Sequence, residues 1–279
     1  MATFHTVPDH QFPPVLCDLD GVVWLAHRGI PGSADAVDRL RAAGHRVVFV
    51  TNNSASSLDE QVAALGNVGI PAEGDVVNSA MAAAGLVSPG ESVLVCGGAG
   101  LREAMDARGA DVVMMTDVAG AGDVEGVEVV AIGWHREFDY RILTLAAGAV
   151  RAGARLLASN DDATYPTPSG PIPGGGAILA AVERAAGVRA LVAGKPHLPM
   201  ADVVVRHLGF DGRADLAHAV MVGDRAETDG AFARTLGCRY AHVDSGVTPA
   251  GSAIESFDVT RDLRAADLAG IADQLLGVA

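Results

Sequence analysis

The chain has 279 residues, 49% of them hydrophobic and 19% charged, so it is long enough for about two domains and too apolar to be disordered. A formal net charge of −14 argues against binding a nucleic-acid backbone, and an aromatic content of 4% argues against a base-stacking surface. The chain has three cysteines without CxxC spacing, an N-terminus unlike a signal peptide and no apolar run of about 18 residues. These features predict a cytoplasmic protein with reduced thiols and no membrane span.

Short β-branched strands alternate with helices from the start of the chain. The segment PVLCDLD (14–20) predicts a strand that ends in acids. A helix follows over 33–44, with Ser33 as its predicted N-cap. HRVVFVTNN (45–53) predicts a second strand that ends in polar residues, and a second helix covers 56–69. This rhythm is typical of a parallel sheet covered by helices.

The same alternation continues to about residue 246. The further predicted strands lie at 91–100, 111–115, 127–134, 154–160, 219–224 and 239–246, and the helices at 101–109, 139–153, 177–187, 200–209 and 228–237, with a Pro/Gly-rich loop at 165–176. Gly/Pro-containing joints lie near 80–90 and 188–194. We therefore expect an α/β fold in which a Rossmann-like core (1–83 and 190–279) carries an inserted α/β domain (84–189).

Four acids lie at or just after the ends of two predicted strands: Asp18 and Asp20 after the first, Asp224 and Asp229 around the strand at 219–224. Ligands of open parallel sheets bind at the carboxyl ends of the strands. Acids that converge there repel one another unless a cation lies among them, and oxygen ligands favour Mg²⁺. The alternative interpretation is structural, with a strand-to-turn junction at the first pair and a helix cap by Thr228 or Asp224 at the second.

The strand at 45–53 ends in Thr51, whose hydroxyl and adjacent amides could donate hydrogen bonds to phosphoryl oxygens. A helix cap, a role that Ser54 or Ser56 could also fill, is the structural alternative. Lys195 is the single lysine among 20 basic residues. A lone ammonium in an arginine-rich chain suggests a site with a steric demand, such as neutralising a phosphoryl group, although chance also explains it.

Four motifs stand in the order typical of the haloacid dehalogenase superfamily, and together they resemble it closely. They are Asp18-Leu19-Asp20-Gly21, Thr51-Asn52-Asn53, Gly194-Lys195-Pro196, and Gly223-Asp224-Arg225 with Thr228-Asp229. The insert between the second and third motifs resembles the C2-type cap of subfamily IIA, and ASNDDATYPTPSGPIPGGGAI resembles that subfamily's signature. The resemblance covers residues 13 to 250.

The resemblance implies a Mg²⁺-dependent phosphatase of small phosphomonoesters. Asp18 would be the nucleophile that forms an aspartyl-phosphate, and Asp20 the general acid and base. Mg²⁺ would be held by the Asp18 carboxylate, the Asp20 backbone carbonyl and Asp224, with Asp229 in support.

The resemblance also implies the residues that bind the substrate. Thr51, Asn52 and Lys195 would bind the phosphoryl group. In the cap, Asn160 and Asp162 would contact the rest of the substrate. Relatives often dimerise through the cap, so a homodimer is an expectation by analogy.

Several alternatives stay open from the sequence. Phosphoglycolate-, glycerol phosphate- or sugar phosphate-like compounds are the first substrate class, and nucleoside monophosphates, with Trp134 or Tyr165 stacking on a base, are the second. A phosphotransferase and a non-catalytic phosphate-binding regulator are further possibilities. Trp134 and His135 depart from the family pattern and affect the choice of substrate. The glycine-rich turn at 97–100 lacks the full GxGxxG pattern, so no dinucleotide cofactor is expected there.

Overall fold

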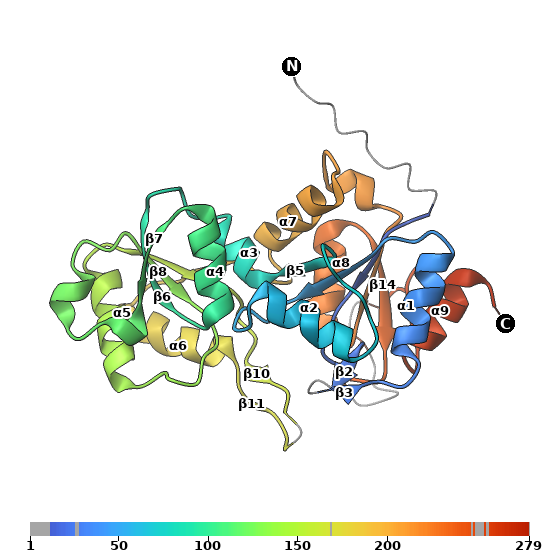
Figure 1. Ribbon diagram of the computed structural model, residues 1–279, viewed down its shortest axis with the longest axis horizontal. Helices are drawn as coiled ribbons and strands as arrows, with labels where there is room; N and C mark the ends of the chain where they lie inside the picture. The colour runs from blue at the N-terminus through green and yellow to red at the C-terminus, as the bar shows by residue number, and fades with distance from the viewer. Residues whose placement is uncertain are drawn as a thin grey trace. The chain divides into compact units, whose positions relative to one another are not determined.

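The computed structural model describes residues 12–25, 28–167, 169–246, 248, 254 and 257–278 (Figure 1). The backbone divides into two compact units, one of residues 1–50, 65–77 and 201–279 and the other of residues 51–64 and 78–200. Each unit contains a parallel sheet with helices, which confirms the α/β prediction. The boundaries near residues 83 and 190 stay a prediction. Among the described residues, every helix is too short or too polar to cross a membrane.

The first unit is built on a sheet of six described strands in the order β15-β14-β13-β1-β4-β5. In chain order this is 3-2-1-4-5-6, the arrangement of a Rossmann-like fold, and the strand order reverses between β1 and β13. The strands are β1 (Val15–Cys17), β4 (Val47–Thr51), β5 (Val76–Asn78), β13 (Val220–Gly223), β14 (Arg239–Val243) and β15 (Leu263–Ala265). β1, β4, β13 and β14 are mostly buried, as expected for strands covered on both faces.

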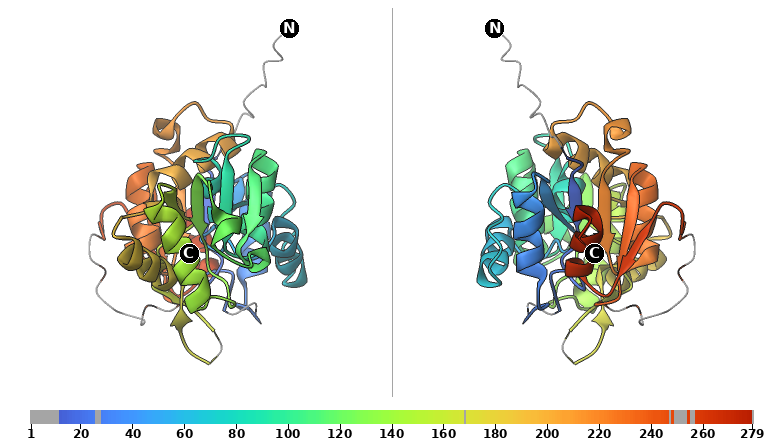
Figure 2. Two further views of the ribbon diagram at one scale, coloured as in Figure 1. Left: turned by 90° about the vertical axis from the view of Figure 1, so that its left-hand side faces the viewer. Right: turned by 90° about the vertical axis from the view of Figure 1, so that its right-hand side faces the viewer.

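Helices α1 (Ser33–Ala42) and α9 (Leu268–Leu276) lie side by side in this unit, where Arg39 forms an ion pair with Asp273 (Figures 1 and 2). The predicted cap of α1 is wrong. Gly32, in the left-handed conformation (φ 84°), is the N-cap residue, and the Ser33 hydroxyl instead donates to the carbonyls of Val23 and Ile30. A hydrogen bond into the core therefore takes the place of a cap.

Helix α8 (Ala231–Leu236) also belongs to this unit, whereas α2 (Leu58–Asn67) and α7 (Leu198–Leu208) each cross a boundary between the two units. Neither Ser54 nor Ser56 caps α2. Instead, the Ser57 hydroxyl accepts from the Glu60 N–H while the Glu60 carboxylate accepts from the Ser57 N–H, which is a capping box. Smaller elements are β2 (Trp24–Leu25), β3 (Arg28–Gly29), η3 (Arg213–Leu216) and the π-helical η4 (Ala226–Gly230).

The main sheet of the second unit has five described strands in the order β12-β9-β8-β6-β7, all parallel. They are β6 (Ser92–Cys96), β7 (Asp111–Met114), β8 (Val129–Ile132), β9 (Arg155–Ala158) and β12 (Leu191–Val192). Its helices are α3 (Ser79–Ala84), α4 (Ala99–Arg108), α5 (Tyr140–Arg151) and α6 (Gly175–Ala186), with 3-10 turns η1 (Met115–Asp117) and η2 (Ala121–Val124). This order, 2-1-3-4-5 in chain order, is a second doubly wound arrangement.

The core of the second unit follows from the alternation of its strands. Leu94, Val130 and Leu156 lie on the sheet face that packs against Ile142 of α5 and Val182 of α6. Figure 2 shows this sheet between α5 and α6 on one side and α4 on the other. The predicted Pro/Gly-rich loop instead contains a short antiparallel hairpin of β10 (Thr164–Tyr165) and β11 (Ile172–Pro173).

Residues 54–56 pack directly against the glycine-rich turn at the start of α4. The Gly100 N–H donates to the Ala55 carbonyl (3.0 Å), and a Cβ at Gly100 would lie 2.0 Å from the Ser56 carbonyl oxygen. A Cβ at Gly98 would lie 2.5 Å from the Ala55 oxygen. These glycines therefore let the 54–56 backbone approach the turn closely, which explains a dinucleotide-like pattern without a dinucleotide.

We predict opposite effects for two glycine substitutions. Gly100→Ala should lower the free energy of unfolding by about 1–3 kcal/mol, because its Cβ would overlap backbone. Gly148→Ala, in the interior of α5 with no described atom beyond its own stretch of helix within 4 Å of the new Cβ, should raise it by about 0.5–1 kcal/mol. Urea denaturation of both variants measures this. Equal stability of the two variants would contradict the close approach at Gly100.

Candidate active site

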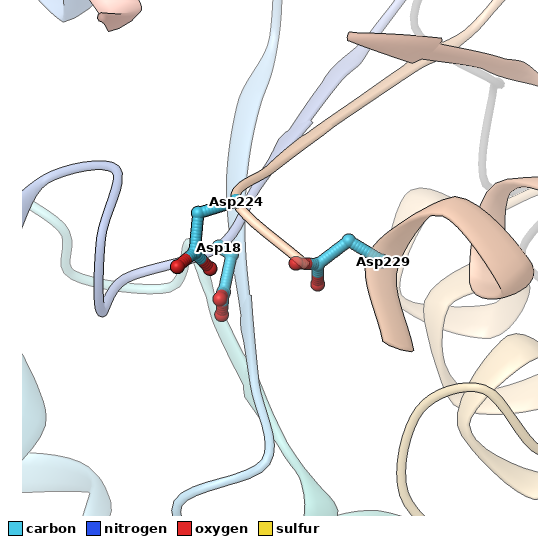
Figure 3. A group of neighbouring side chains, drawn as sticks. All are labelled: Asp18, Asp224 and Asp229. Carbon is cyan, nitrogen blue, oxygen red and sulfur yellow. The ribbon is translucent and has the colours of Figure 1, made fainter. Parts of the chain in front are cut away.

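Three carboxylates meet at the point where the strand order of the first unit reverses. Asp18 follows β1, Asp224 follows β13, and Asp229 belongs to the π-helical turn η4. One carboxylate oxygen of each lies within 4.8 Å of the others, and Figure 3 shows Asp229 reaching from its turn toward the other two. Asp224 and Asp229 are each only 1% exposed, whereas Asp18 is half-buried. The structure therefore brings together three of the four predicted acids.

Such a cluster suits a hard divalent cation. Carboxylates this close repel one another strongly, and burial increases the repulsion because water screens it less. A cation removes this penalty, and an all-oxygen set with one half-buried member fits Mg²⁺, which keeps some of its water ligands. The chemistry of these residues is therefore compatible with the predicted metal.

Glycines make the room that the buried carboxylates occupy. A Cβ at Gly246 would lie 2.0 Å from Asp224 Oδ2, and one at Gly223 would lie 2.2 Å from the side chain of Asp229. Gly21, with φ +86°, would place a Cβ 2.5 Å from Asp224 Cγ. Gly21 therefore has two reasons to be glycine, its left-handed backbone and its close approach to an acid.

Asp20 lies in the tight turn that Gly21 permits. Its backbone forms an isolated bridge with Trp24, and its side chain is half-buried and is not part of the three-carboxylate group. The Asp20 carboxylate is therefore outside the group of acids that the structure brings together. The roles of Asp18, Asp20, Asp224 and Asp229 in catalysis stay predictions.

Tyr240 supports the acidic cluster, and the sequence analysis missed it. Its hydroxyl donates to the Gly223 carbonyl (3.2 Å) and lies 2.9 Å from His242 Nδ1. Burial raises the pKa of Tyr240, and the negative charges of Asp229 and Asp224 raise it further, so the phenol stays a neutral donor. The alternation in RYAHV, which places Tyr240 and His242 on one face of β14, was the available signal.

The other predicted residues gather in the second unit, around Asn52. The Asn52 side chain accepts a hydrogen bond from the Lys195 N–H (2.8 Å) and donates to the Lys195 carbonyl (3.0 Å) and to Asp162 Oδ2 (2.9 Å). Asn160 Nδ2 donates to the Asn52 carbonyl (2.8 Å). Thr51, at the end of β4, accepts from the Asn53 N–H (3.1 Å). The second and third motifs and the two predicted cap residues therefore form one hydrogen-bonded group.

Lys195 lies between β12 and α7 and is only 1% exposed. Nearby, His197 Nε2 lies 3.0 Å from Asp161 Oδ2. The hydrogen bond to Asp161 raises the pKa of His197, and the hydrogen bond from His197 lowers the pKa of Asp161. His197 thus has a carboxylate partner, in line with a structural role.

The aromatic residues that could contact a base stack on each other instead. The rings of Trp134 and Tyr165 lie 4.8 Å apart at an angle of 13°, and Trp134 Nε1 donates to the Pro173 carbonyl (3.0 Å). The pair therefore fixes the β10–β11 hairpin to the end of β8. His135 is buried, and burial lowers its pKa.

Comparison with known proteins agrees with this arrangement. A family model described as haloacid dehalogenase-like hydrolase matches residues 15–111, and one described as HAD-hydrolase-like matches residues 192–272. The acid sugar phosphatase of Staphylococcus saprophyticus is 34% identical over 242 residues, which cover 85% of this chain and 88% of the relative. Human chronophin is 36% identical over 248 residues, 84% of this chain and 81% of its own.

A solved structure is similar over most of the chain as well. The glycerol phosphate phosphatase of Mycobacterium tuberculosis, in complex with magnesium, superposes with a TM-score of 0.79 at 32% identity, covering 93% of this chain and 76% of that one. The chain therefore belongs to the haloacid dehalogenase-like hydrolases, in subfamily IIA, and is a phosphomonoesterase of that family.

Proposed function

We propose that this protein hydrolyses a small phosphomonoester through an aspartyl-phosphate on Asp18, with Mg²⁺ as its cofactor. The observation that carries the proposal is the group of three carboxylates within 4.8 Å of one another at the strand-order reversal of a Rossmann-like sheet. A merely structural junction has no need for three acids, two of them 1% exposed, around one point.

In the proposed reaction, Asp18 attacks phosphorus, the bond from phosphorus to the ester oxygen breaks, and Asp20 protonates the leaving alkoxide. Asp20 then takes a proton from a water molecule, which attacks phosphorus and releases phosphate from Asp18. Mg²⁺, held by Asp18, Asp224 and the Asp20 carbonyl with Asp229 in support, supplies positive charge that offsets the negative charge of the phosphoryl oxygens.

Thr51 and Lys195 are proposed to bind the phosphoryl oxygens. Their contribution is positioning and electrostatic stabilisation, which dominate catalysis of phosphoryl transfer. An ammonium that is 1% exposed acts in a medium where charge–charge attraction is stronger than in water.

Small polar phosphomonoesters such as phosphoglycolate, glycerol phosphate and sugar phosphates are the proposed substrates, with Asn160 and Asp162 on the cap side. The names of the relatives, an acid sugar phosphatase and a glycerol phosphate phosphatase, support this class. Nucleoside monophosphates come second, because Trp134 and Tyr165 already stack on each other.

The proposal also covers the setting of the enzyme. A reducing compartment such as the cytoplasm is supported by the three cysteines, which are buried and have no CxxC spacing. A homodimer is part of the proposal, and nucleic acids and membranes are left out as partners because of the net charge of −14.

A phosphate-release screen tests the substrate class. With Mg²⁺, kcat/KM for glycerol phosphate, phosphoglycolate or a sugar phosphate should exceed that for nucleoside monophosphates by about 10-fold or more, since Trp134 and Tyr165 stack on each other rather than on a base. Chelation with EDTA should abolish turnover and added Mg²⁺ should restore it. A preference for nucleotides would overturn the assignment. Transfer of phosphate to added acceptor alcohols rather than water would show a phosphotransferase.

Asp18→Asn should reduce kcat by about 10³-fold or more, because an amide cannot form the aspartyl-phosphate. Asp38→Asn, the same change on the exposed face of α1, is the matched control and should retain wild-type kinetics. The measurement is phosphate release with and without Mg²⁺. Equal activity of Asp18→Asn and wild type would sink the mechanism, and a lack of Mg²⁺-dependent phosphate release by both would favour a non-catalytic phosphate-binding protein.

Lys195→Arg should lower kcat/KM by about 10²-fold or more, because the wide, planar guanidinium does not fit where a buried ammonium does. Steady-state kinetics together with a urea denaturation curve separate this effect from loss of folding. Near-wild-type kinetics would mean that the single lysine of the chain is a matter of composition.

A further inference from the structure

The side chain of Asn52 has no donor left for a substrate. An asparagine amide offers two N–H donors. One goes to the Lys195 carbonyl (3.0 Å) and the other to Asp162 Oδ2 (2.9 Å). The orientation of the amide is fixed independently, because only its oxygen can accept from the Lys195 N–H (2.8 Å). A phosphoryl oxygen could receive a hydrogen bond from this side chain only if one of these contacts broke.

Asn52 binds both backbone groups of Lys195, as a neighbouring strand would. Lys195 needs such a partner, because it lies after the end of β12 and before the start of α7, outside regular structure. The close fit is visible at Gly194, where a Cβ would lie 2.6 Å from Asn52 Oδ1 and 2.5 Å from the Ser159 carbonyl oxygen. The glycine before the lysine therefore makes room for the asparagine that holds it.

The backbone of Asn52 is itself held in place by hydrogen bonds. Its carbonyl accepts hydrogen bonds from Ser79 Oγ (2.7 Å) and Asn160 Nδ2 (2.8 Å), and the residue is buried. Four neighbours thus fix one asparagine, and all of them except the half-buried Asp162 are buried. Breaking such a network is costly, since it leaves buried polar groups without hydrogen-bond partners.

We infer that Asn52 is a positioning residue, which holds the Lys195 backbone so that the ammonium occupies one place, and that its side chain is not a phosphate ligand. Asp162 completes the clamp by binding the second amide hydrogen. For the Asn52 side chain, the predicted contact with phosphate is thereby replaced by an action through Lys195, whereas its backbone amide stays a predicted phosphate donor. The inference rests on the proposed function, in which Lys195 neutralises the phosphoryl group.

The first test does not depend on activity, because Lys195 is the only lysine of the chain. Reductive methylation with ¹³C-formaldehyde labels lysine side chains and the N-terminal amine, and mass spectrometry resolves the two. Asn52→Ala should raise the labelling rate of Lys195 by about 10-fold or more as the clamp is lost. Asn67→Ala, an exposed asparagine at the end of α2, is the matched control and should leave the rate unchanged. An unchanged rate in Asn52→Ala would overturn the inference.

The second test is a double-mutant cycle with Lys195→Met, measured as kcat/KM for 4-nitrophenyl phosphate and as affinity for inorganic phosphate by calorimetry with Mg²⁺ present. Asn52→Ala should cost about 10- to 100-fold in the wild-type background and less than about 3-fold in Lys195→Met. Equal losses in both backgrounds would show that Asn52 contacts phosphate itself. If Lys195→Met alone has no effect, the role proposed for the lysine fails, while the labelling result still decides the clamp. Should Asn52→Ala not fold, Asn52→Asp, which keeps the acceptor for the Lys195 N–H and opposes its carbonyl, replaces it.

Discussion

The repulsion among three neighbouring carboxylates, two of them buried, is the constraint on which the first unit depends. Asp18, Asp224 and Asp229 are held within 4.8 Å by strands whose ends a parallel sheet places side by side. The fold provides the room through glycines at 21, 223 and 246, where any Cβ would overlap a carboxylate. It provides rigidity through the Tyr240 hydroxyl on the carbonyl that precedes Asp224. The repulsion among these carboxylates lowers the stability of the fold unless a divalent cation binds among them. A sequence selected for stability alone would therefore avoid this arrangement.

In the second unit, the corresponding constraint is a buried lysine, Lys195, whose backbone lies outside any helix or strand. Backbone groups outside helices and strands still need partners when they are buried. Here one asparagine side chain supplies both, and the glycine before the lysine is required for its approach. Glycine also permits a close backbone contact at Gly98 and Gly100, which pack against the backbone of residues 54–56. A glycine-rich motif that resembles a ligand-binding loop in sequence can therefore serve to let another segment of the chain pack closely.

Much of the fold follows from local pattern. The long buried strands and amphipathic helices appear where the alternation of apolar residues predicts them, with ends that differ by a few residues. The short elements were not predictable in this way: β5 and β15 have three residues each, and the β10–β11 hairpin lies in a Pro/Gly-rich segment. Two or three residues carry no periodicity, so only the neighbouring strand or the stacking of Tyr165 on Trp134 decides their conformation. The Ser33 cap was wrong for a similar reason, because carbonyls of residues earlier in the chain compete for its hydroxyl.

The sequence alone determined which residue types lie at the strand ends and in which order they occur. These local properties were sufficient to predict a group of acids around a metal and a lysine beside a phosphoryl group. Only the tertiary structure decided which side chains act on which. Whether an asparagine binds a ligand or a backbone depends on what lies within hydrogen-bond distance, and residues 52, 162 and 195 are far apart in the chain. The same holds for Tyr240, whose partner Gly223 lies on the neighbouring strand. Hydrogen bonds and ion pairs act over a few ångströms in space, a quantity that sequence separation does not contain.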